Sequence, residues 1–257
     1  MTKPSIHVWE LFQEAVDTVR DNLAEALRFS GVVFILSILV TSAIYVAMIG
    51  AIAPPTIDPA IFEEGGAGMP TDILVASLIN GIISFVVFAW VAIEWHRFAL
   101  GGVRLPSILP RWDTGRVLRY LGNTVLLGVM IAFAVAFPFG LLIGILGAIG
   151  LGGFVALLPL VMMWVGYYVI FRAGLILPAA ALDEPMRLRE SMNRTQDIAG
   201  PLWGLAGLHL AVSFFGVMII SFLPAQSIVG VVLGGAIQWF LVLLSASLLS
   251  SVYKATR

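Results

Sequence analysis

The uncharged stretch from Tyr120 to Phe171 constrains this chain more than any other feature, because it contains no Asp, Glu, Lys, Arg or His. A second stretch, from Ile198 to Tyr253, is interrupted only by His209. A helix rises about 1.5 Å per residue, so about 20 apolar residues cross the roughly 30 Å hydrocarbon core of a bilayer. Each stretch is therefore long enough for two crossings, which predicts an integral membrane protein.

The composition excludes several classes of protein. Hydrophobic residues make up 60% of the 257 residues and charged residues 11%, against roughly 45–50% and about 25% in soluble domains. A net charge of -1 provides no basic field, so we expect no nucleic-acid partner. The absence of cysteine excludes disulfides and thiolate sites. The sequence contains no zinc-peptidase, nucleophile-elbow or nucleotide-binding motif, so we expect no enzyme, no cofactor and no metal.

Turn residues and charges predict one membrane domain, residues 1–257, with six crossings. Pro54 ends the first crossing, since proline cannot continue a helix without losing a hydrogen bond. Pro138 and Gly140 lie late in the third crossing, where we expect a kink. The predicted transmembrane helices lie at about 31–53, 73–93, 120–140, 154–177, 201–223 and 228–252. The predicted fold class is all-α, an integral membrane bundle of six transmembrane helices with an N-terminal amphipathic interfacial helix.

The interfacial helix is predicted at residues 5–29, where apolar residues from Trp9 to Leu27 recur at helical spacing. Its acids outnumber its basic residues, whereas anionic lipid would favour the reverse. These acids are Glu10, Glu14, Asp17, Asp21 and Glu25. The helix either packs under the bundle or presents a docking surface to a basic partner. A second charged surface helix is predicted at about 184–197.

The charges divide cleanly between the two sides of this layout. All 14 Lys and Arg residues fall on the side that holds both termini and the second and fourth loops. The first loop, on the other side, carries acids only: Asp58, Glu63, Glu64 and Asp72. Cytoplasmic loops retain Lys and Arg, so both termini are predicted to be cytoplasmic.

Polar residues inside the predicted crossings are the first candidates for function: Asn80, Asn123, His209 and Gln238. A polar group in hydrocarbon costs free energy unless it is paired, so such groups mark solute or proton pathways. The alternative is that they hydrogen-bond across helices for roughly 1 kcal/mol each. No membrane-centre carboxylate accompanies His209, which argues against proton-coupled transport.

A second group of candidates lies where the second and fourth crossings end. Glu94 and Arg97 are three residues apart on one helical face and can form an ion pair, with His96 between them. One Glu and one His are too few for a metal site. Arg172 either extends to the interface, pairs with Glu94 or Glu190, or binds a lipid phosphate.

Small residues recur four apart at three places in or beside the predicted crossings, a spacing that lets helix backbones approach closely. These pairs are Gly140 and Gly144, Gly200 and Gly204, and Gly230 and Gly234. The close approach is either within the chain or between two copies of it. The expected partners are therefore membrane lipids, together with a membrane-protein partner or a homo-oligomer.

The segment from Ile176 to Trp203, ILPAAALDEPMRLRESMNRTQDIAGPLW, combines a helix end containing Pro178 with a short amphipathic helix. It resembles the region before the last helical hairpin in YciC-like bacterial six-helix membrane proteins. Those proteins in turn resemble the membrane domain of some glycerophosphodiester phosphodiesterases. This chain has no phosphodiesterase domain, so the resemblance implies a bacterial inner-membrane protein and supplies no site residues.

The first expectation for function is a non-enzymatic accessory or organising subunit that packs against other membrane components. The alternative is a carrier or channel for a small or lipidic solute, in which Asn80, Asn123, His209 and Gln238 meet in one cavity. An enzyme would require Glu94, His96, Arg97 and Arg172 to face one another.

Overall fold

Six long apolar helices dominate the computed structural model, which describes residues 7–54, 69–104, 109 and 111–257. Each is long and apolar enough to cross a membrane, and no strand occurs in the described part of the chain. The chain is therefore a multi-pass helical membrane protein, and the predicted fold class is confirmed. The spans are Leu23–Ile49, Thr71–Gly101, Thr114–Ala148, Gly153–Ala173, Gln196–Ser221 and Ile228–Ala255. The predicted acids Asp58, Glu63 and Glu64 lie outside the described residues.

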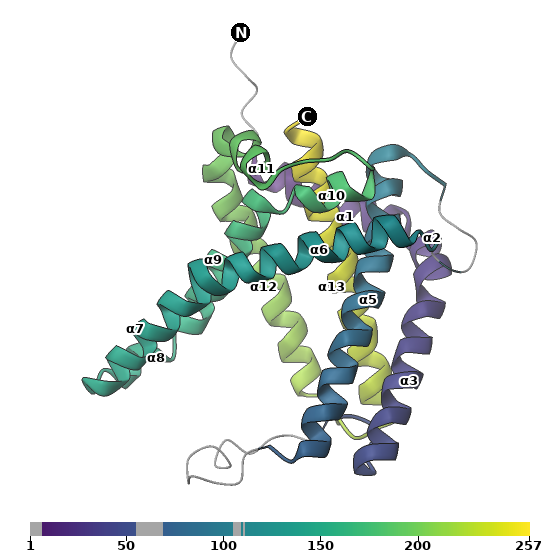
Figure 1. The fold of residues 1–257 in the computed structure, drawn as a ribbon, viewed down its shortest axis with the longest axis vertical. Helices are drawn as coiled ribbons and strands as arrows, with labels where there is room; N and C mark the ends of the chain where they lie inside the picture. Colours follow the sequence, from purple (N-terminus) through teal and green to yellow (C-terminus); the bar gives the residue numbers. More distant parts are fainter. Residues whose placement is uncertain (1–6, 55–68, 105–108, 110) are drawn as a thin grey trace.

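Four helices stand upright and side by side (Figure 1). Helix α3 (Val32–Ile49) packs against α5 (Thr71–Gly101), and α12 (Ala199–Ser221) packs against α13 (Ile228–Ala255). Helix α13 also contacts α5 and α3, so it joins the two pairs. Most of the buried residues of α13 are in its second half, from Leu243 to Tyr253, near the end of the bundle where the C-terminus lies (Figure 1). We call this end the charged face.

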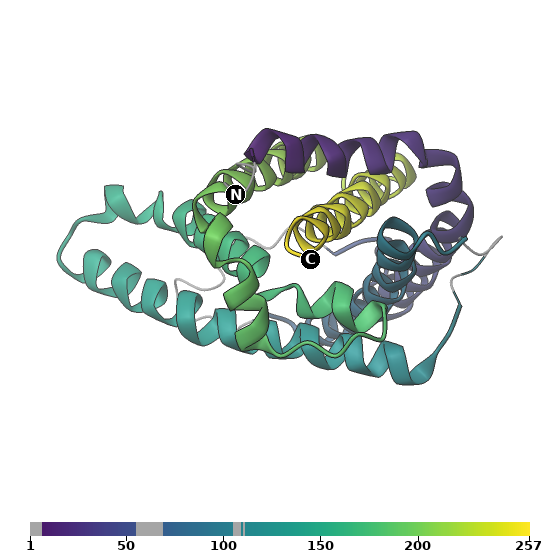
Figure 2. The ribbon, with the colours of Figure 1, turned by 90° about the horizontal axis from the view of Figure 1, so that it is seen from above.

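The third and fourth spans form a hairpin that runs obliquely to the upright helices and projects beyond them (Figures 1 and 2). Its elements are α6 (Thr114–Ile131), η2 (Ala132–Ala136), α7 (Phe137–Ala148), α8 (Gly152–Val155) and α9 (Leu158–Ala173). No residue of α7 is buried. The third span is longer than the predicted 120–140, and the irregularity expected near Pro138 is the π-helical turn η2, because proline cannot supply the amide that a regular helix needs.

Helix α1 (Val8–Asp21) lies across the charged face (Figure 2). Its apolar stripe of Leu11, Ala15 and Val19 is buried against α13 and α12. The predicted surface helix at 5–29 is too long at its C-terminal end. The helix breaks at Asn22, whose side chain donates to the carbonyl of Thr18 at 2.9 Å.

The first span therefore begins about eight residues before the predicted position 31. Helix α2 (Leu23–Ala26) and the π-helix η1 (Leu27–Gly31) lead directly into α3. The π-helix buries Ser30, whose hydroxyl donates to the carbonyl of Ala26 and accepts from Trp239 Nε1 at 2.7 Å. The wide turn thus places a polar group where α13 can pair with it.

The fourth span ends at Ala173, before the predicted residue 177. Helix α10 (Ile176–Ala181) turns away from it, is fully buried and packs against α6 and α5. The surface helix predicted at about 184–197 is present as α11 (Leu188–Arg194) followed by η3 (Gln196–Ile198). The second span runs two turns past the predicted residue 93, so Glu94, His96 and Arg97 belong to a continuous helix.

The predicted glycine pairs have different environments. A Cβ at Gly204 would lie 2.9 Å from a methyl group of Val8, so this glycine allows α1 to approach α12. A Cβ at Gly140 or Gly144 would meet nothing within 4 Å. One member of the second pair therefore serves packing within the chain, while the first pair faces outward.

We expect Gly204→Leu to lower stability by about 1–3 kcal/mol, because the larger side chain must push α1 off α12. Gly144→Leu is the matched control, since it adds the same side chain to an open position. Thermal unfolding of both variants in the same lipid discs checks this. Equal midpoints for the two variants would show that α1 does not depend on this contact.

Candidate functional site

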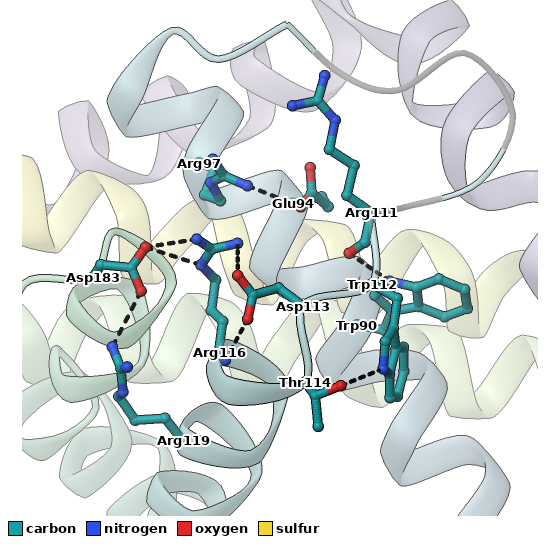
Figure 3. A network of polar contacts seen from close by, with 10 residues as sticks. All are labelled: Trp90, Glu94, Arg97, Arg111, Trp112, Asp113, Thr114, Arg116, Arg119 and Asp183. Carbon is teal, nitrogen blue, oxygen red and sulfur yellow. Dashed lines mark hydrogen bonds and ion pairs between the residues drawn. The ribbon is translucent and has the colours of Figure 1, made fainter.

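A polar network on the charged face joins the start of α6 to the loop after α10 (Figure 3). Arg116, on the first turn of α6, donates to Asp183 Oδ2 from Nε at 3.2 Å and from Nη2 at 2.6 Å. Arg119 donates to the other oxygen of Asp183 at 3.1 Å. Asp113 caps α6 by accepting the backbone N–H of Arg116 at 3.1 Å. The network ties the loop after α10 to the start of the projecting hairpin.

Two guanidinium groups hold the pKa of the Asp183 carboxyl below its usual range, chiefly through the hydrogen bonds from Arg116. Asp183 also has φ 60, a left-handed conformation that Asp tolerates better than most residues. Its neighbour Glu184 accepts from Tyr253 Oη and from Arg257, each at 2.6 Å, which lower the pKa of Glu184. Adjacent acids therefore fasten the same loop to α6 and to the C-terminal end of α13.

The candidates on the second span are engaged in separate contacts. Glu94, only 1% exposed, pairs with Arg97 at 3.2 Å, as the three-residue spacing predicts. His96 is fully buried; Nδ1 lies 2.8 Å from Ser250 Oγ and Nε2 lies 3.2 Å from Tyr120 Oη. Both ring nitrogens are thus occupied by hydroxyls of α13 and α6.

Arg172 is bound within its own hairpin and the helix that follows it. It donates to Thr195 Oγ1 at 2.9 Å, to Tyr168 Oη at 3.0 Å and to the carbonyl of Met192 at 3.0 Å. Of the three alternatives for Arg172, the ion pair with Glu94 or Glu190 does not form in the described part of the chain, where Glu94 pairs with Arg97 and Glu190 pairs with Arg194 at 2.7 Å. The guanidinium instead fixes α9 to the α11 segment.

The structure does not bring Glu94, His96, Arg97 and Arg172 together into one site, and each is engaged locally. Within the described ranges, no three His, Asp or Glu side chains are grouped closely enough to hold a metal ion.

A cavity of about 440 Å³ lies between α5, α6, α9, α12 and α13. Its size is in the range of pockets that hold small organic molecules. The walls are mainly apolar, and no Asp, Glu, Lys or Arg lines it. The polar residues on its walls are Tyr120, Thr124, Tyr167, His209, Ser213, Gln238 and Ser245.

His209 is the most unusual polar group in this cavity. The side chain is only 4% exposed, and its ring meets the Tyr167 ring edge to face with centroids 4.4 Å apart. Nε2 lies 3.3 Å from Ser245 Oγ. Nδ1 is buried and has no hydrogen-bond partner in the described structure. A buried orphan of this kind costs about 1–3 kcal/mol. Its accessible surface is below 1 Å², so this nitrogen faces packed protein atoms and not the open part of the cavity.

The four intramembrane candidates divide into two groups. His209 and Gln238 line the same cavity, and Gln238 is exposed. Asn123 donates to the carbonyl of Ile176 at 3.1 Å, and Ser84 Oγ lies 3.5 Å from Asn80 Oδ1. Neither asparagine lines the cavity. The expected convergence of all four residues is therefore wrong for Asn80 and Asn123.

The sequence reasoning missed Ser213 and Ser245. Ser213 is one helical turn after His209 on α12, and Ser245 is two turns after Gln238 on α13, so each shares a face with a predicted candidate. In the sequence, only this helical spacing from His209 and Gln238 indicates that the two serines line the same cavity. Serine is common in transmembrane helices because its hydroxyl bonds to its own backbone, and this makes single serines uninformative.

Comparison of the chain with protein-family models, with curated proteins and with solved structures finds no match. The resemblance noted for residues 176–203 therefore gains no support, and function has to be argued from the geometry.

We expect Asp183→Asn to lower the free energy of unfolding near neutral pH by about 1 kcal/mol or less, because the side chain is half exposed. Asparagine tolerates the same left-handed backbone, so the change removes only charge. Because the folded-state pKa is lowered, the carboxylate contributes above its unfolded pKa and loses its effect as the pH falls through the folded value. The difference between wild type and variant should therefore shrink in acid.

Thermal unfolding from pH 7 down to pH 3 measures this difference, with Asp21→Asn on α1 as a control that leaves the α6 anchor intact. A gap that stays constant across this range would contradict the assignment of the stabilisation to the Asp183 charge.

Proposed function

We propose that this protein is a non-enzymatic multi-pass membrane protein that binds a lipid-like solute in the cavity between α5, α6, α9, α12 and α13. The observation that carries the proposal is the cavity of about 440 Å³ itself, whose walls are mainly apolar and include the polar side chains of His209, Ser213 and Gln238. This favours solute binding over the accessory expectation, although only His209 and Gln238 of the four residues named in the carrier expectation line the cavity. The scattered, locally satisfied positions of Glu94, His96, Arg97 and Arg172 support the non-enzymatic part.

The position of the cavity favours a solute that arrives from the bilayer. Phe85, Met163 and Val217 line it and are 37%, 41% and 59% exposed, and each lies within a membrane-spanning helix. The mouth therefore opens sideways toward lipid. The solute would be largely apolar, because the walls are, and it would carry one polar end toward His209.

The orientation that we propose places the charged face in the cytoplasm of a bacterial cell, with the protein in the inner membrane. The support is the sidedness of the 14 Lys and Arg residues. In the structure, Lys254 pairs with Glu14, and Arg257 pairs with Glu184, at the same end of the bundle as α1. The bacterial origin rests on the resemblance of residues 176–203 alone.

Filling the cavity should remove the solute. Ala92, on α5, is 8% exposed and lines the cavity, so Ala92→Phe should lower the amount of co-purifying lipid at least about tenfold, a loss of ~1.4 kcal/mol. Ala134→Phe makes the same change at an exposed position of the projecting hairpin and should retain the lipid. Mass spectrometry of protein released from lipid discs gives both occupancies. Equal lipid content in the two variants would refute the proposal.

A second candidate function is the accessory subunit, and the surface of α1 favours it. The apolar stripe of this helix packs under the bundle, while its opposite face lines an open groove of about 580 Å³. Four acids border this groove: Glu10, Glu14, Asp17 and Asp21. Lys254 and Arg20 offset part of the charge. An acidic excess remains for a basic partner.

Reversing Asp17 and Asp21 to Lys should weaken capture of such a partner from native membranes while leaving the apolar face of α1 in place. Asp17→Cys, in a chain that has no other cysteine, should react with a membrane-impermeant maleimide only from the cytoplasmic side. If the charge-reversed protein still co-purifies with the same partner, this face has no accessory role. If Asp17→Cys is labelled from the outer side, the proposed orientation is wrong.

A further inference from the structure

Two tryptophans mark where the surface of the bilayer crosses α5 and the start of α6. Trp90 lies near the end of the uncharged run Ile73–Ile93 of α5, on the side of the charged face. Trp112, just before α6, meets the Trp90 ring edge to face with centroids 5.2 Å apart, and it is 54% exposed. Tryptophan side chains gather where hydrocarbon meets water. The pair therefore lies at the depth of the lipid headgroups.

This tryptophan pair holds Arg111 at the same depth. Trp90 Nε1 donates to the carbonyl oxygen of Arg111 at 3.0 Å, and Trp112 Nε1 donates to Thr114 Oγ1 at 3.0 Å. These bonds fix the backbone of Arg111 beside α5. In Figure 3 its side chain extends away from the tryptophans, in the direction in which α5 continues from Trp90 to Arg97. The guanidinium therefore points from the edge of the hydrocarbon into the headgroup layer.

The guanidinium of Arg111 has no counter-charge in the part of the chain that the structure describes. The three carboxylates drawn in Figure 3 are engaged by other arginines: Glu94 by Arg97, Asp113 by Arg116, and Asp183 by Arg116 and Arg119. Residues 105–108 and 110, which lie outside the described ranges, include no Asp or Glu. The network contains four arginines and three carboxylates, so one positive charge remains in excess, at Arg111.

A free guanidinium at this depth matches the phosphate of a phospholipid. Its planar fork of donors can bind two phosphate oxygens at once. A zwitterionic headgroup would bring its own ammonium group to a place that already has an excess of positive charge. A headgroup with one net negative charge neutralises that excess, while the exposed ring of Trp112 packs against the glycerol and the start of the acyl chains. The arrangement therefore favours an anionic glycerophospholipid.

We propose that Arg111, beside the Trp90–Trp112 pair, binds the phosphate of an anionic glycerophospholipid in the leaflet at the charged face. This site lies on the outer surface and shares no residue with the cavity between α5, α6, α9, α12 and α13. It goes beyond the proposed function, because it holds a lipid at the surface whether or not the cavity takes a solute. The bound lipid fixes the start of the projecting hairpin at the depth of the headgroups.

The test compares two photoreactive lipids, a phosphatidylglycerol and a phosphatidylcholine, with the same acyl chain and a diazirine next to the glycerol. Each is titrated into phosphatidylcholine discs that hold the full-length protein, and the labelled peptide that carries Trp112 is quantified by mass spectrometry. Half-maximal labelling should need about fivefold less phosphatidylglycerol, because one arginine near the surface gives a preference of this size for an anionic lipid. Equal labelling by the two lipids in the wild-type protein overturns the proposal, and this comparison needs no variant.

Three variants assign the preference to Arg111. Arg111→Gln removes the charge but keeps the backbone carbonyl that accepts from Trp90, so the two lipids should label within about twofold of each other. Arg111→Lys keeps the charge and should keep most of the preference. Arg189→Gln removes an exposed positive charge from α11 and should leave the preference at Trp112 unchanged. An equal loss in Arg111→Gln and Arg189→Gln would indicate a diffuse field of the whole charged face, and the proposed site would be wrong.

A soluble competitor identifies the source of the phosphate. An excess of glycerol phosphate should leave labelling by phosphatidylglycerol unchanged, because it lacks the acyl chains that place the phosphate beside Trp112. Displacement of the lipid by this competitor would overturn the assignment to a membrane lipid. Ala92→Phe, which fills the cavity, should leave labelling at Trp112 unchanged, so the cavity and the surface site are tested separately.

Discussion

The structure depends on one constraint: a polar group that enters the apolar interior must find its hydrogen-bond partner inside the protein. The buried tryptophans satisfy it through serines on distant helices, with Trp95 Nε1 donating to Ser247 and Trp239 Nε1 donating to Ser30, each at 2.7 Å. His96 satisfies it twice, through Ser250 and Tyr120. These pairs link η1, α5, α6 and α13, so pairing requirements fix which helices are neighbours. His209 Nδ1 stands out because it breaks this rule in the described structure.

The same requirement explains why burial is concentrated near the charged face. Residues Leu243 to Tyr253 of α13 and Ala89 to His96 of α5 supply much of the core, whereas the opposite halves of these helices are largely exposed to lipid. Arg116 and Arg119 then fasten the loop after α10, and Arg257 and Tyr253 fasten it from the other side. Packing and ion pairing thus stabilise one end of the bundle.

Sequence reasoning could predict the crossings because hydrocarbon thickness dictates the length of an apolar helix. It placed the ends less well, because helices such as α5 continue past the hydrophobic run when Glu94 and Arg97 pair with each other. The break at Asn22 and the π-turn at Leu27–Gly31 depend on Thr18 and on Trp239, which are contacts that hydropathy does not encode. His209 and Gln238 could be predicted as candidates because a polar side chain in hydrocarbon costs free energy. That Asn80 and Asn123 lie away from the cavity could not be predicted, because it depends on how the helices pack.

The projecting hairpin has a consequence for how the protein fits bilayers of different thickness. The span Thr114–Ala148 has 35 residues, which corresponds to about 50 Å of helix at ~1.5 Å per residue. A helix of this length can match about 30 Å of hydrocarbon by leaning, so its inclination responds to membrane thickness. Since α6 and α9 form one wall of the cavity, a thicker bilayer that rights the hairpin also moves that wall. Hydrophobic mismatch is thereby coupled to the volume of the cavity.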